Sequence, residues 1–431
     1  MKTPLVLLRC LGSLLSLVLR GGGVCFWAAT LTSTPAIGEE RLLAEAGTND
    51  ARFTELQFRL QRFVDRHQIP AMSVAFTYQG KIRYARGFGF ADRERLIPVT
   101  SKSLFRIASV SKPITAVAIM QLTEKGRCAL EDRVFEILED PQAREKIGDH
   151  YDRRLDAITL RMLLEHRAGW DRDVSLDPMF RSAHFARIEG VRGPATAEVV
   201  IRGMLRQPLD FSPGQRYAYS NFGYCLLGRV IEKVSGQPYE TYVREHVLQP
   251  LGISAMRIGG TQPHEREPDE VAYFDSGVAP SIYPEDHGML RPAPDGTWSL
   301  EAMDAHGGWI ASAVDLAIFS IAFDDPERSP ILSHESIQRM FAPPSIRDRQ
   351  EDPHLYYSLG WQNRYLPEHQ QYNRWHSGSL PGTLAILIRG HQGITMVALT
   401  NTRESPHTGD LALALDRILW KAVGSVDSWE P

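Results

Sequence analysis

Residues 104–116 read LFRIASVSKPITA and hold a serine and a lysine three positions apart, Ser109 and Lys112. Lysine is rare in this chain, which has eight lysines among its 48 lysines and arginines. Arginine is effectively always protonated, whereas a buried lysine can lose its proton and act as a base. The stretch therefore predicts a chemical role for Lys112 beyond that of a positive charge.

The apolar run that follows, PITAVAIMQLTEKG, predicts a buried helix that ends at Gly126. If this helix starts near Ser109, the spacing puts Ser109 and Lys112 on one face, one turn apart. Pro113 is compatible with a first helical turn and not with a helix interior. The N–H groups and the positive dipole end at a helix start could stabilise a developing oxyanion. The alternative is a helix cap followed by a surface lysine, because an S-x-x-K motif alone is weak.

Helical and strand patterns flank this stretch on both sides. Residues 49–70 place apolar side chains on one helical face, and residues 72–92 alternate apolar and polar residues as a β-hairpin does. The middle of the chain, 130–299, is rich in helical patterns, and strand-like runs and a closing helix come after it.

This order predicts an α/β fold of the α+β type. One mixed sheet would be completed by both ends of the chain, and a mostly helical lobe would be inserted between them. The domain would span 51–425, with a sheet lobe of about 51–129 and 300–425 and a helical lobe of about 130–299. A ligand site is expected in the cleft between the lobes.

A second motif lies in RYAYSNFGY, where Tyr219-Ser220-Asn221 follows an S-P-G turn signal and precedes an apolar helix. A tyrosine beside a lysine can hold a depressed pKa and pass a proton. An asparagine offers both a donor and an acceptor to a substrate amide. Alone the motif is weak, because tyrosine and asparagine in loops are usually structural.

A third motif lies in RWHSGSLPG, where His376-Ser377-Gly378 comes at the end of a short strand. The missing Cβ of Gly378 would let a substrate approach the backbone. The N–H group of Ser379 could then act as a second oxyanion donor. A lone histidine is more often packed or hydrogen-bonded than catalytic.

Composition limits the function classes. The net charge of −4 and the pI near 6.4 show no surplus of basic residues of the kind that binding to a nucleic acid needs. Cys128 and Cys225 in the body of the chain do not make a disulfide scaffold and are expected to be small buried residues. No spacing of Cys and His resembles a metal site, so neither a metal nor another cofactor is expected.

Residues 1–36 differ from the rest. A positive start, the short apolar run LGSLLSLVL and a small-residue exit predict an export signal, and hence a periplasmic or extracellular protein. An uncleaved membrane anchor and a wrongly assigned start are the alternatives. Residues 37–50 are polar and small, and are expected to form a linker.

The three motifs in this order resemble the serine β-lactamase and penicillin-binding-protein superfamily. The chain is most similar to the class C-like branch, which includes D-alanyl-D-alanine carboxypeptidases, D-aminopeptidases and carboxylesterases. The resemblance covers about residues 55 to 420. Its supporting phrases are LFRIASVSKPITA, FSPGQRYAYSN, GYCLLGRVIEKVSGQPY, QPLGI, HGGWIASAVDLAIF, YSLGWQ and HSGSLPGT.

The resemblance implies a β-lactamase/transpeptidase-like fold, in which helices flank an antiparallel sheet and a mostly helical lobe is added. It implies that Ser109 is the acylated nucleophile and that Lys112 and Tyr219 handle its proton. The N–H groups of Ser109 and Ser379 would form the oxyanion hole. The residues expected to bind the substrate are Asn221, His376, Gly378 and Ser379.

One departure from the family bears on the substrate. Many β-lactamases carry K-T-G where this chain has His376-Ser377-Gly378, and neutral histidine holds a substrate carboxylate less well than a permanent cation. This favours an esterase or a peptidase over an efficient β-lactamase, but esters, amides or peptides, and β-lactams all stay open as substrates.

The rival function is a binding module, a penicillin-binding sensor of the same fold that acylates once or not at all. A small-molecule or peptide substrate is the only partner implied, and the oligomeric state stays open.

Overall fold

The computed structural model describes residues 46–92, 94, 96–138, 147–345 and 352–430. The predicted export signal, 1–36, and most of the predicted linker lie outside the described residues. Within the described ranges, no helix combines the length and the apolar character that a membrane crossing needs.

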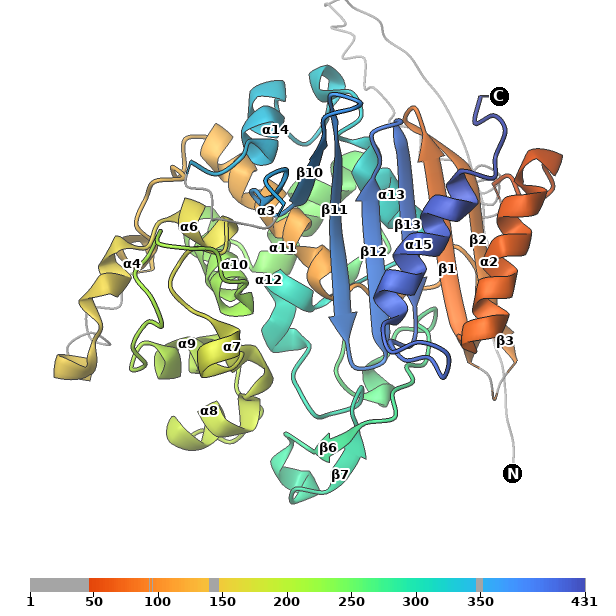
Figure 1. Cartoon of the computed structure of the whole chain (residues 1–431). Helices are drawn as coiled ribbons and strands as arrows, with labels where there is room; N and C mark the ends of the chain where they lie inside the picture. Colours follow the sequence, from red (N-terminus) through yellow and green to blue (C-terminus); the bar gives the residue numbers. More distant parts are fainter. Residues whose placement is uncertain (1–45, 93, 95, 139–146, 346–351, 431) are drawn as a thin grey trace, which may run out of the picture.

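A sheet of eight antiparallel strands forms the centre of the described structure, in the order β3-β2-β1-β13-β12-β11-β10-β9 (Figure 1). The two ends of the chain meet where β1 pairs with β13, so the prediction that both ends complete one sheet is confirmed. The sheet is antiparallel throughout these strands, as the resemblance implied, and not mixed as the pattern of elements suggested. The strands are β1 (Ala71–Tyr78), β2 (Lys81–Asp92), β3 (Ile97–Pro98), β9 (Leu355–Tyr357), β10 (Gln362–Leu366), β11 (Gln371–Leu380), β12 (Thr383–Arg389) and β13 (Ile394–Thr400).

The predicted hairpin is the β1–β2 pair. Gln79 and Gly80 connect the strands with φ angles of 48° and 71°, the left-handed conformation that a two-residue hairpin turn requires. Both faces of β1 are buried, because one core packs on each side of the sheet.

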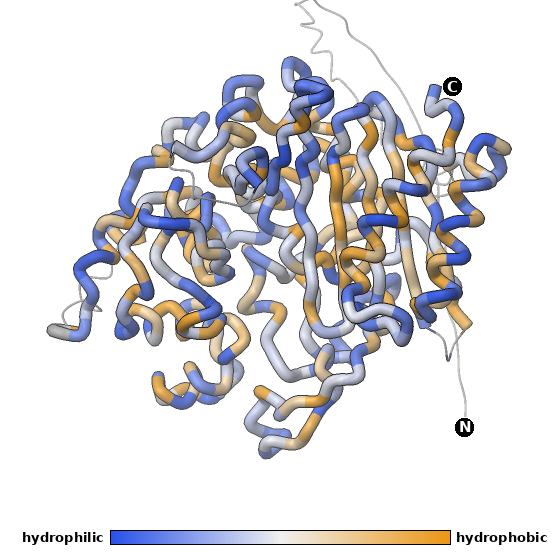
Figure 2. The backbone as a smooth tube through the Cα atoms, viewed as in Figure 1, coloured by the Kyte–Doolittle hydropathy of each residue, from blue (hydrophilic) through white to orange (hydrophobic). Residues whose placement is uncertain are grey.

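Two layers of helices cover the sheet. On one face lie α2 (Thr54–His67) and α15 (Leu411–Val423), which contact each other and pack their apolar side chains on the strands. On the other face lie α3 (Ser111–Glu124) and α13 (Ala313–Ile321), which belong to the larger core. Figure 2 shows hydrophobic residues along the central strands and hydrophilic residues along much of α2.

The 15-residue helix α10, several shorter helices and short strands complete the structure beside α3. Cys128 and Cys225 are buried and free, as expected. The last part of the predicted helical lobe, from Arg257 onward, contains β5, β6 and β7 in place of long helices. The remaining helices are α4 (Val134–Ile137), α6 (Leu160–Leu164), α7 (Arg172–Ser175), α8 (Ser182–Ile188), α9 (Ala197–Met204), α10 (Asn221–Ser235), α11 (Tyr239–Val243), α12 (Asp304–Gly307) and α14 (His334–Phe341). The remaining strands are β4 (Phe105–Arg106), β5 (Arg257–Ile258), β6 (Val278–Pro280), β7 (Leu290–Pro292) and β8 (Trp309–Ala311).

Candidate active site

Ser109 lies in a single 3₁₀ turn, Ala108–Val110, which leads directly into α3. The turn is held by the N–H group of Val110, which donates to the carbonyl of Ile107, and by the hydroxyl of Ser111, which donates to the carbonyl of Ala108. Ala108 has a φ of 48°, a left-handed conformation that costs a residue with a side chain about 1 kcal/mol or more. The packing around the turn therefore enforces the position of Ser109 at the start of the helix.

Gly378 of β11 packs against this turn. A Cβ atom at position 378 would lie 2.2 Å from the carbonyl oxygen of Ile107 and 2.9 Å from the amide nitrogen of Ser109. From the sequence, the missing Cβ of this glycine was predicted to let a substrate approach the backbone. The structure shows a different requirement for glycine at position 378, because the absence of a side chain lets β11 approach the backbone that carries the nucleophile.

Lys112 lies one turn further along α3 and is fully buried. Its Nζ is 3.0 Å from the Oγ of Ser109, 2.7 Å from the Oδ1 of Asn221 and 2.9 Å from the carbonyl oxygen of His306. Burial holds the pKa of Lys112 well below its ordinary value, and the nearby charges of Asp177 and Arg172 act in opposite directions. The alternative of a surface lysine is thus wrong.

Tyr219 lies on the other side of the nucleophile, and its hydroxyl is 2.8 Å from the Oγ of Ser109. Its ring also lies beside Lys112, with the Nζ 4.8 Å from the ring centroid. Burial raises the pKa of Tyr219 well above its ordinary value. The expectation of a depressed tyrosine pKa is therefore wrong, because desolvation outweighs every interaction with neighbouring groups, and the phenol keeps its proton at neutral pH.

Asn221 is the first residue of α10, and both ends of its side-chain amide are engaged. Its Oδ1 accepts from Lys112, and its Nδ2 donates to the Oδ2 of Asp177 over 2.6 Å. A carboxylate accepts and a lysine donates, so these two partners fix the orientation of the amide. Asp177 is itself held in place, because its Oδ1 accepts from the N–H group of Met179.

His376 lies on β11 with 3% of its surface exposed. Its Nδ1 is 2.8 Å from the carbonyl oxygen of Ser377 and its Nε2 is 3.0 Å from the hydroxyl of Tyr357. A carbonyl only accepts, so the Nδ1 carries the proton and the Nε2 accepts from the tyrosine. Burial lowers the pKa of His376 to about 3, so the ring is neutral at physiological pH.

Ser379 lies on the exposed side of the same strand. Pairing with β10 covers only residues 371–375 of β11, while β12 pairs with residues 374–380. In the described part of the chain, no strand pairs with residues 376–380 on the β10 side. This open strand edge lies beside the turn of Ser109, where a substrate backbone or an oxyanion could reach strand N–H groups.

Sequence reasoning missed two parts of this site. Asp177 precedes Asn221 by 44 residues, in a D-P pair that caps a short helix, which is a weak signal. The third partner of Lys112 is the backbone carbonyl of His306. Every residue has a backbone carbonyl, so the sequence gives no signal for this contact.

His166 has a structural role beside the nucleophile. Its carbonyl accepts from the N–H group of Ala218, and its Nδ1 accepts from the N–H group of Ser220. These two bonds flank Tyr219, whose ring also packs 4.3 Å from the imidazole, centroid to centroid. His166 therefore positions the loop that carries Tyr219.

The fold and these contacts define a serine hydrolase, in which a serine at a helix start shares its hydroxyl with a buried lysine and a neutral tyrosine. The chain belongs to the β-lactamase family: the family model described as Beta-lactamase matches residues 56–419. The predicted family resemblance is thereby confirmed.

Individual relatives carry several functional names. Penicillin-binding protein 4* of Bacillus subtilis is 26% identical over 354 residues, which cover 81% of this chain and 72% of the relative. Esterase EstB of Burkholderia gladioli is 28% identical over 389 residues, which cover 82% of this chain and 91% of the relative.

Solved structures have the same fold. The octameric penicillin-binding protein homologue from Pyrococcus abyssi has a TM-score of 0.62 and 25% identity, and the match covers 86% of this chain and 76% of that one. The D-amino acid amidase from Ochrobactrum anthropi has a TM-score of 0.64 and 22% identity, and the match covers 87% of this chain and all of that one.

Proposed function

We propose that the protein hydrolyses carboxylic esters, and amides more slowly, through an acyl-enzyme on Ser109 with Lys112 as the general base. One observation carries the proposal. The three partners of the Lys112 amine are the Oδ1 of Asn221, a backbone carbonyl and the hydroxyl of Ser109. Only the hydroxyl can donate a hydrogen bond.

This set of partners fits a neutral amine. A neutral amine has two hydrogens and one lone pair, so it donates to Asn221 and to the carbonyl of His306. Its lone pair then faces the hydroxyl of Ser109, which donates to it. The lowered pKa of Lys112 favours the neutral form, and the geometry supports proton transfer from Ser109 to the amine.

Acylation follows from this geometry. The Oγ of Ser109 attacks the carbonyl carbon of the substrate while its proton passes to the Nζ of Lys112. The N–H groups of Ser109 and Ser379 donate to the oxyanion of the tetrahedral intermediate. The carbonyl–oxygen or carbonyl–nitrogen bond of the substrate then breaks, and the leaving group takes a proton from the hydroxyl of Tyr219, which regains one from Lys112.

Deacylation again uses Lys112 as the base. A water molecule attacks the acyl carbon and gives its proton to the Nζ of Lys112. The bond to the Oγ of Ser109 breaks, and this oxygen takes its proton from the ammonium of Lys112, which becomes neutral again. Lys112 thus serves as the base in both half-reactions, and its amine must be neutral at the start of each.

The neutral state of His376 bears on the substrate. At a pKa of about 3, this ring offers no positive charge to a substrate carboxylate at neutral pH. That favours uncharged acyl groups over the carboxylate-bearing β-lactams. The similarity to an esterase over 91% of that relative's length supports esters as the first substrates to test.

The test is the hydrolysis of p-nitrophenyl butyrate by the full chain and by its Ser109→Ala variant. Ser428→Ala is a matched control, because Ser428 is exposed near the C-terminus. We expect turnover by the wild type and by the control, and none above background by Ser109→Ala. Mass spectrometry of the wild type after rapid quenching should detect a butyryl adduct on the peptide that contains Ser109.

Two results would contradict the proposal. Undiminished turnover in Ser109→Ala would place the chemistry elsewhere. A stable covalent adduct with no turnover of esters or amides would show that the protein is a sensor that acylates once, the rival function.

A further inference from the structure

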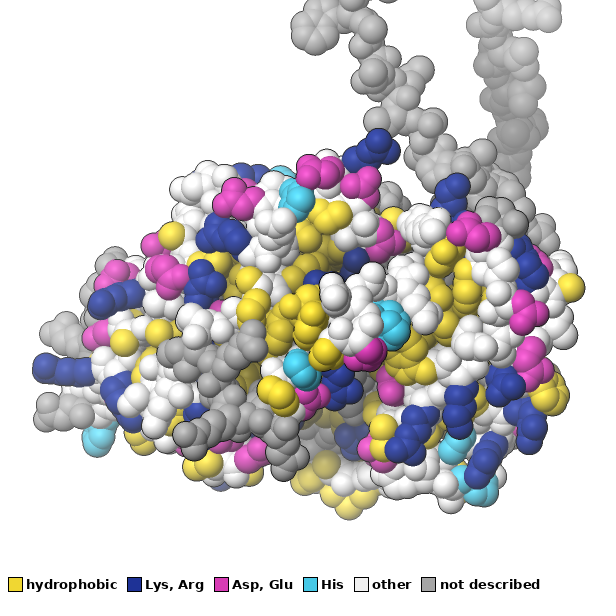
Figure 3. All heavy atoms as spheres, turned by 45° about the horizontal axis from the view of Figure 1, so that its top comes forward, with side chains coloured by type: hydrophobic (Ala, Val, Ile, Leu, Met, Phe, Trp, Pro, Cys, Tyr) yellow, Lys and Arg dark blue, Asp and Glu magenta, His cyan; other side chains and the backbone are white. Residues whose placement is uncertain are grey.

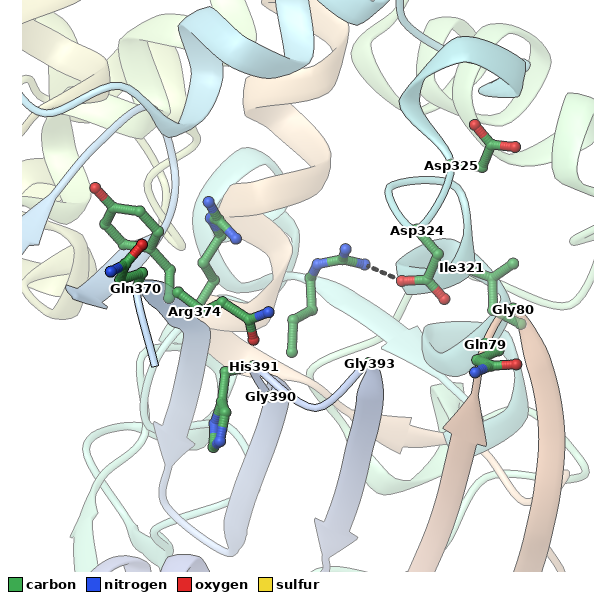
Figure 4. A pocket seen from close by; sticks show the side chains of 13 residues that line it. Gln79, Gly80, Ile321, Asp324, Asp325, Gln370, Arg374, Gly390, His391 and Gly393 are labelled. Atoms are coloured by element: carbon green, nitrogen blue, oxygen red, sulfur yellow. Dashed lines mark ion pairs between the residues drawn. The ribbon is translucent and has the colours of Figure 1, made fainter. Parts of the chain in front are cut away.

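Two adjoining cavities lie at one end of the large sheet, away from Ser109. The larger, of about 730 Å³, is lined by the β1–β2, β10–β11 and β12–β13 turns, as the labels of Gln79, Gln370 and Gly393 in Figure 4 show. The smaller, of about 340 Å³, lies against α14. Figure 3, tilted to bring the top of Figure 1 forward, shows hydrophobic side chains among charged ones of both signs on this side of the molecule.

Arg374 and Arg389 line both cavities and sit directly opposite each other on β11 and β12. Like charges in this cross-strand position destabilise a sheet unless something compensates them. Arg389 is compensated: it pairs with Asp324 over 3.0 Å, the dashed line in Figure 4, and it donates to the carbonyl of Ser320.

Arg374 lacks such compensation. Among the described residues, no carboxylate lies within ion-pair distance of its guanidinium, and its Nε is buried without an acceptor. Two aromatic rings hold the group in place, with centroids 4.5 Å (Phe341) and 4.8 Å (Tyr372) from its Cζ. Burial, with a contribution from Arg389, lowers the pKa of Arg374 to about 10, so the charge persists at pH 7.

The lining of the smaller cavity indicates what could neutralise this charge. Besides the two arginines, its walls are formed mainly by apolar and aromatic side chains, and the described wall contains no acidic residue. A guanidinium binds a carboxylate through two parallel hydrogen bonds, and the apolar walls suit a hydrocarbon body. The apolar and aromatic residues of the wall are Phe323, Pro326, Ile337, Phe341, Ala342, Pro343, Tyr356 and Tyr372.

We propose that Arg374 is the anchor of a binding site for a small carboxylate with an apolar or aromatic body, seated in the smaller cavity. The site is separate from the catalytic one. Tyr356 lines the cavity, whereas the next residue, Tyr357, shares a hydrogen bond with His376. Neither cavity is lined by Ser109, Lys112 or Tyr219.

The test is calorimetric titration of the full chain with phenylacetate, and with phenylacetamide as the uncharged equivalent. We expect saturable binding of phenylacetate and at least tenfold weaker binding of the amide, since a hydrogen bond to a charged group is lost. Arg374→Gln should weaken phenylacetate binding at least tenfold while leaving ester hydrolysis within twofold of wild type. Ser109→Ala should bind phenylacetate as the wild type does, which separates this site from a product site at Ser109.

Arg364→Gln is the matched control, because Arg364 lies on the neighbouring strand β10, half exposed and paired with Asp352. It should leave phenylacetate binding unchanged. Equal binding of phenylacetate and phenylacetamide by the wild type would overturn the proposal, and this comparison needs no variant to fold. So would unchanged binding by a folded Arg374→Gln, loss of binding in Ser109→Ala, or inorganic phosphate binding as tightly as phenylacetate.

Discussion

Lys112→Arg is the change that tests the proposed base most directly. Arginine keeps a positive charge and five donors, but it has no lone pair and stays protonated at any working pH. In the native site the amine already has two acceptors, the Oδ1 of Asn221 and the carbonyl of His306, so its lone pair can act only on the hydroxyl of Ser109. The substitution removes that use while keeping the charge.

The expected loss is that of one general base, about 100- to 10,000-fold in kcat/KM. This corresponds to about 3–5 kcal/mol of transition-state stabilisation. The assay is p-nitrophenyl butyrate hydrolysis from pH 5 to 9, with thermal melting to show that the variant is folded. Lys125→Arg is the control, because Lys125 is exposed at the other end of α3 and should keep full activity.

The pH profile adds a second readout with a definite sign. The reaction needs the neutral amine, so kcat/KM of the wild type should fall as the pH drops through the pKa of Lys112, which burial holds below its ordinary value. Lys112→Arg should lack this acidic limb. If a folded Lys112→Arg protein kept more than a tenth of the wild-type kcat/KM, or kept the limb, Lys112 would serve only as a charge and the reasoning would be refuted.

Three further substitutions probe the groups around the nucleophile. Tyr219→Phe removes the hydroxyl that lies 2.8 Å from the Oγ of Ser109 and should lower kcat/KM about a hundredfold, whereas a loss of less than threefold would exclude a role in proton transfer. His376→Gln should leave the acidic limb of the pH profile at the same pH as in the wild type, because His376 has a pKa of about 3 and is already neutral. A shift of this limb would show that His376 titrates in the same pH range. Gly378→Ala should lower the free energy of unfolding by about 1–3 kcal/mol in urea denaturation, because its Cβ would lie 2.2 Å from a carbonyl oxygen; an unchanged midpoint would mean that the turn adjusts freely.

Local patterns were enough to predict much of this molecule. The apolar run after Pro113 predicted α3, and the alternation in 72–92 predicted the β1–β2 hairpin. The spacing of Ser109 and Lys112 predicted a shared helical face, and their atoms are indeed 3.0 Å apart. These features depend on neighbours in the sequence, whose geometry is fixed by the backbone conformation alone.

Other features depend on residues that only the complete fold brings together. The direction of the Tyr219 pKa shift follows from burial, which the motif does not encode. The hydrogen bond from Asn221 to Asp177 joins the first residue of α10 to the cap of a short helix 44 residues earlier, and the uncompensated charge of Arg374 depends on the register between β11 and β12. A sequence pattern identifies the residue type in each case but not the neighbours that set its protonation state or its partner.

The state of Lys112 shows why this distinction matters for function. The serine and the lysine come from one short stretch, a 3₁₀ turn and the first turn of α3, but the two groups that accept the lysine's hydrogens come from positions 221 and 306. Without these acceptors, the amine would be free to turn one of its hydrogens toward Ser109 and would then be a poor base. The S-x-x-K spacing thus brings the base within reach of the nucleophile, and the distant acceptors decide in which direction the proton moves.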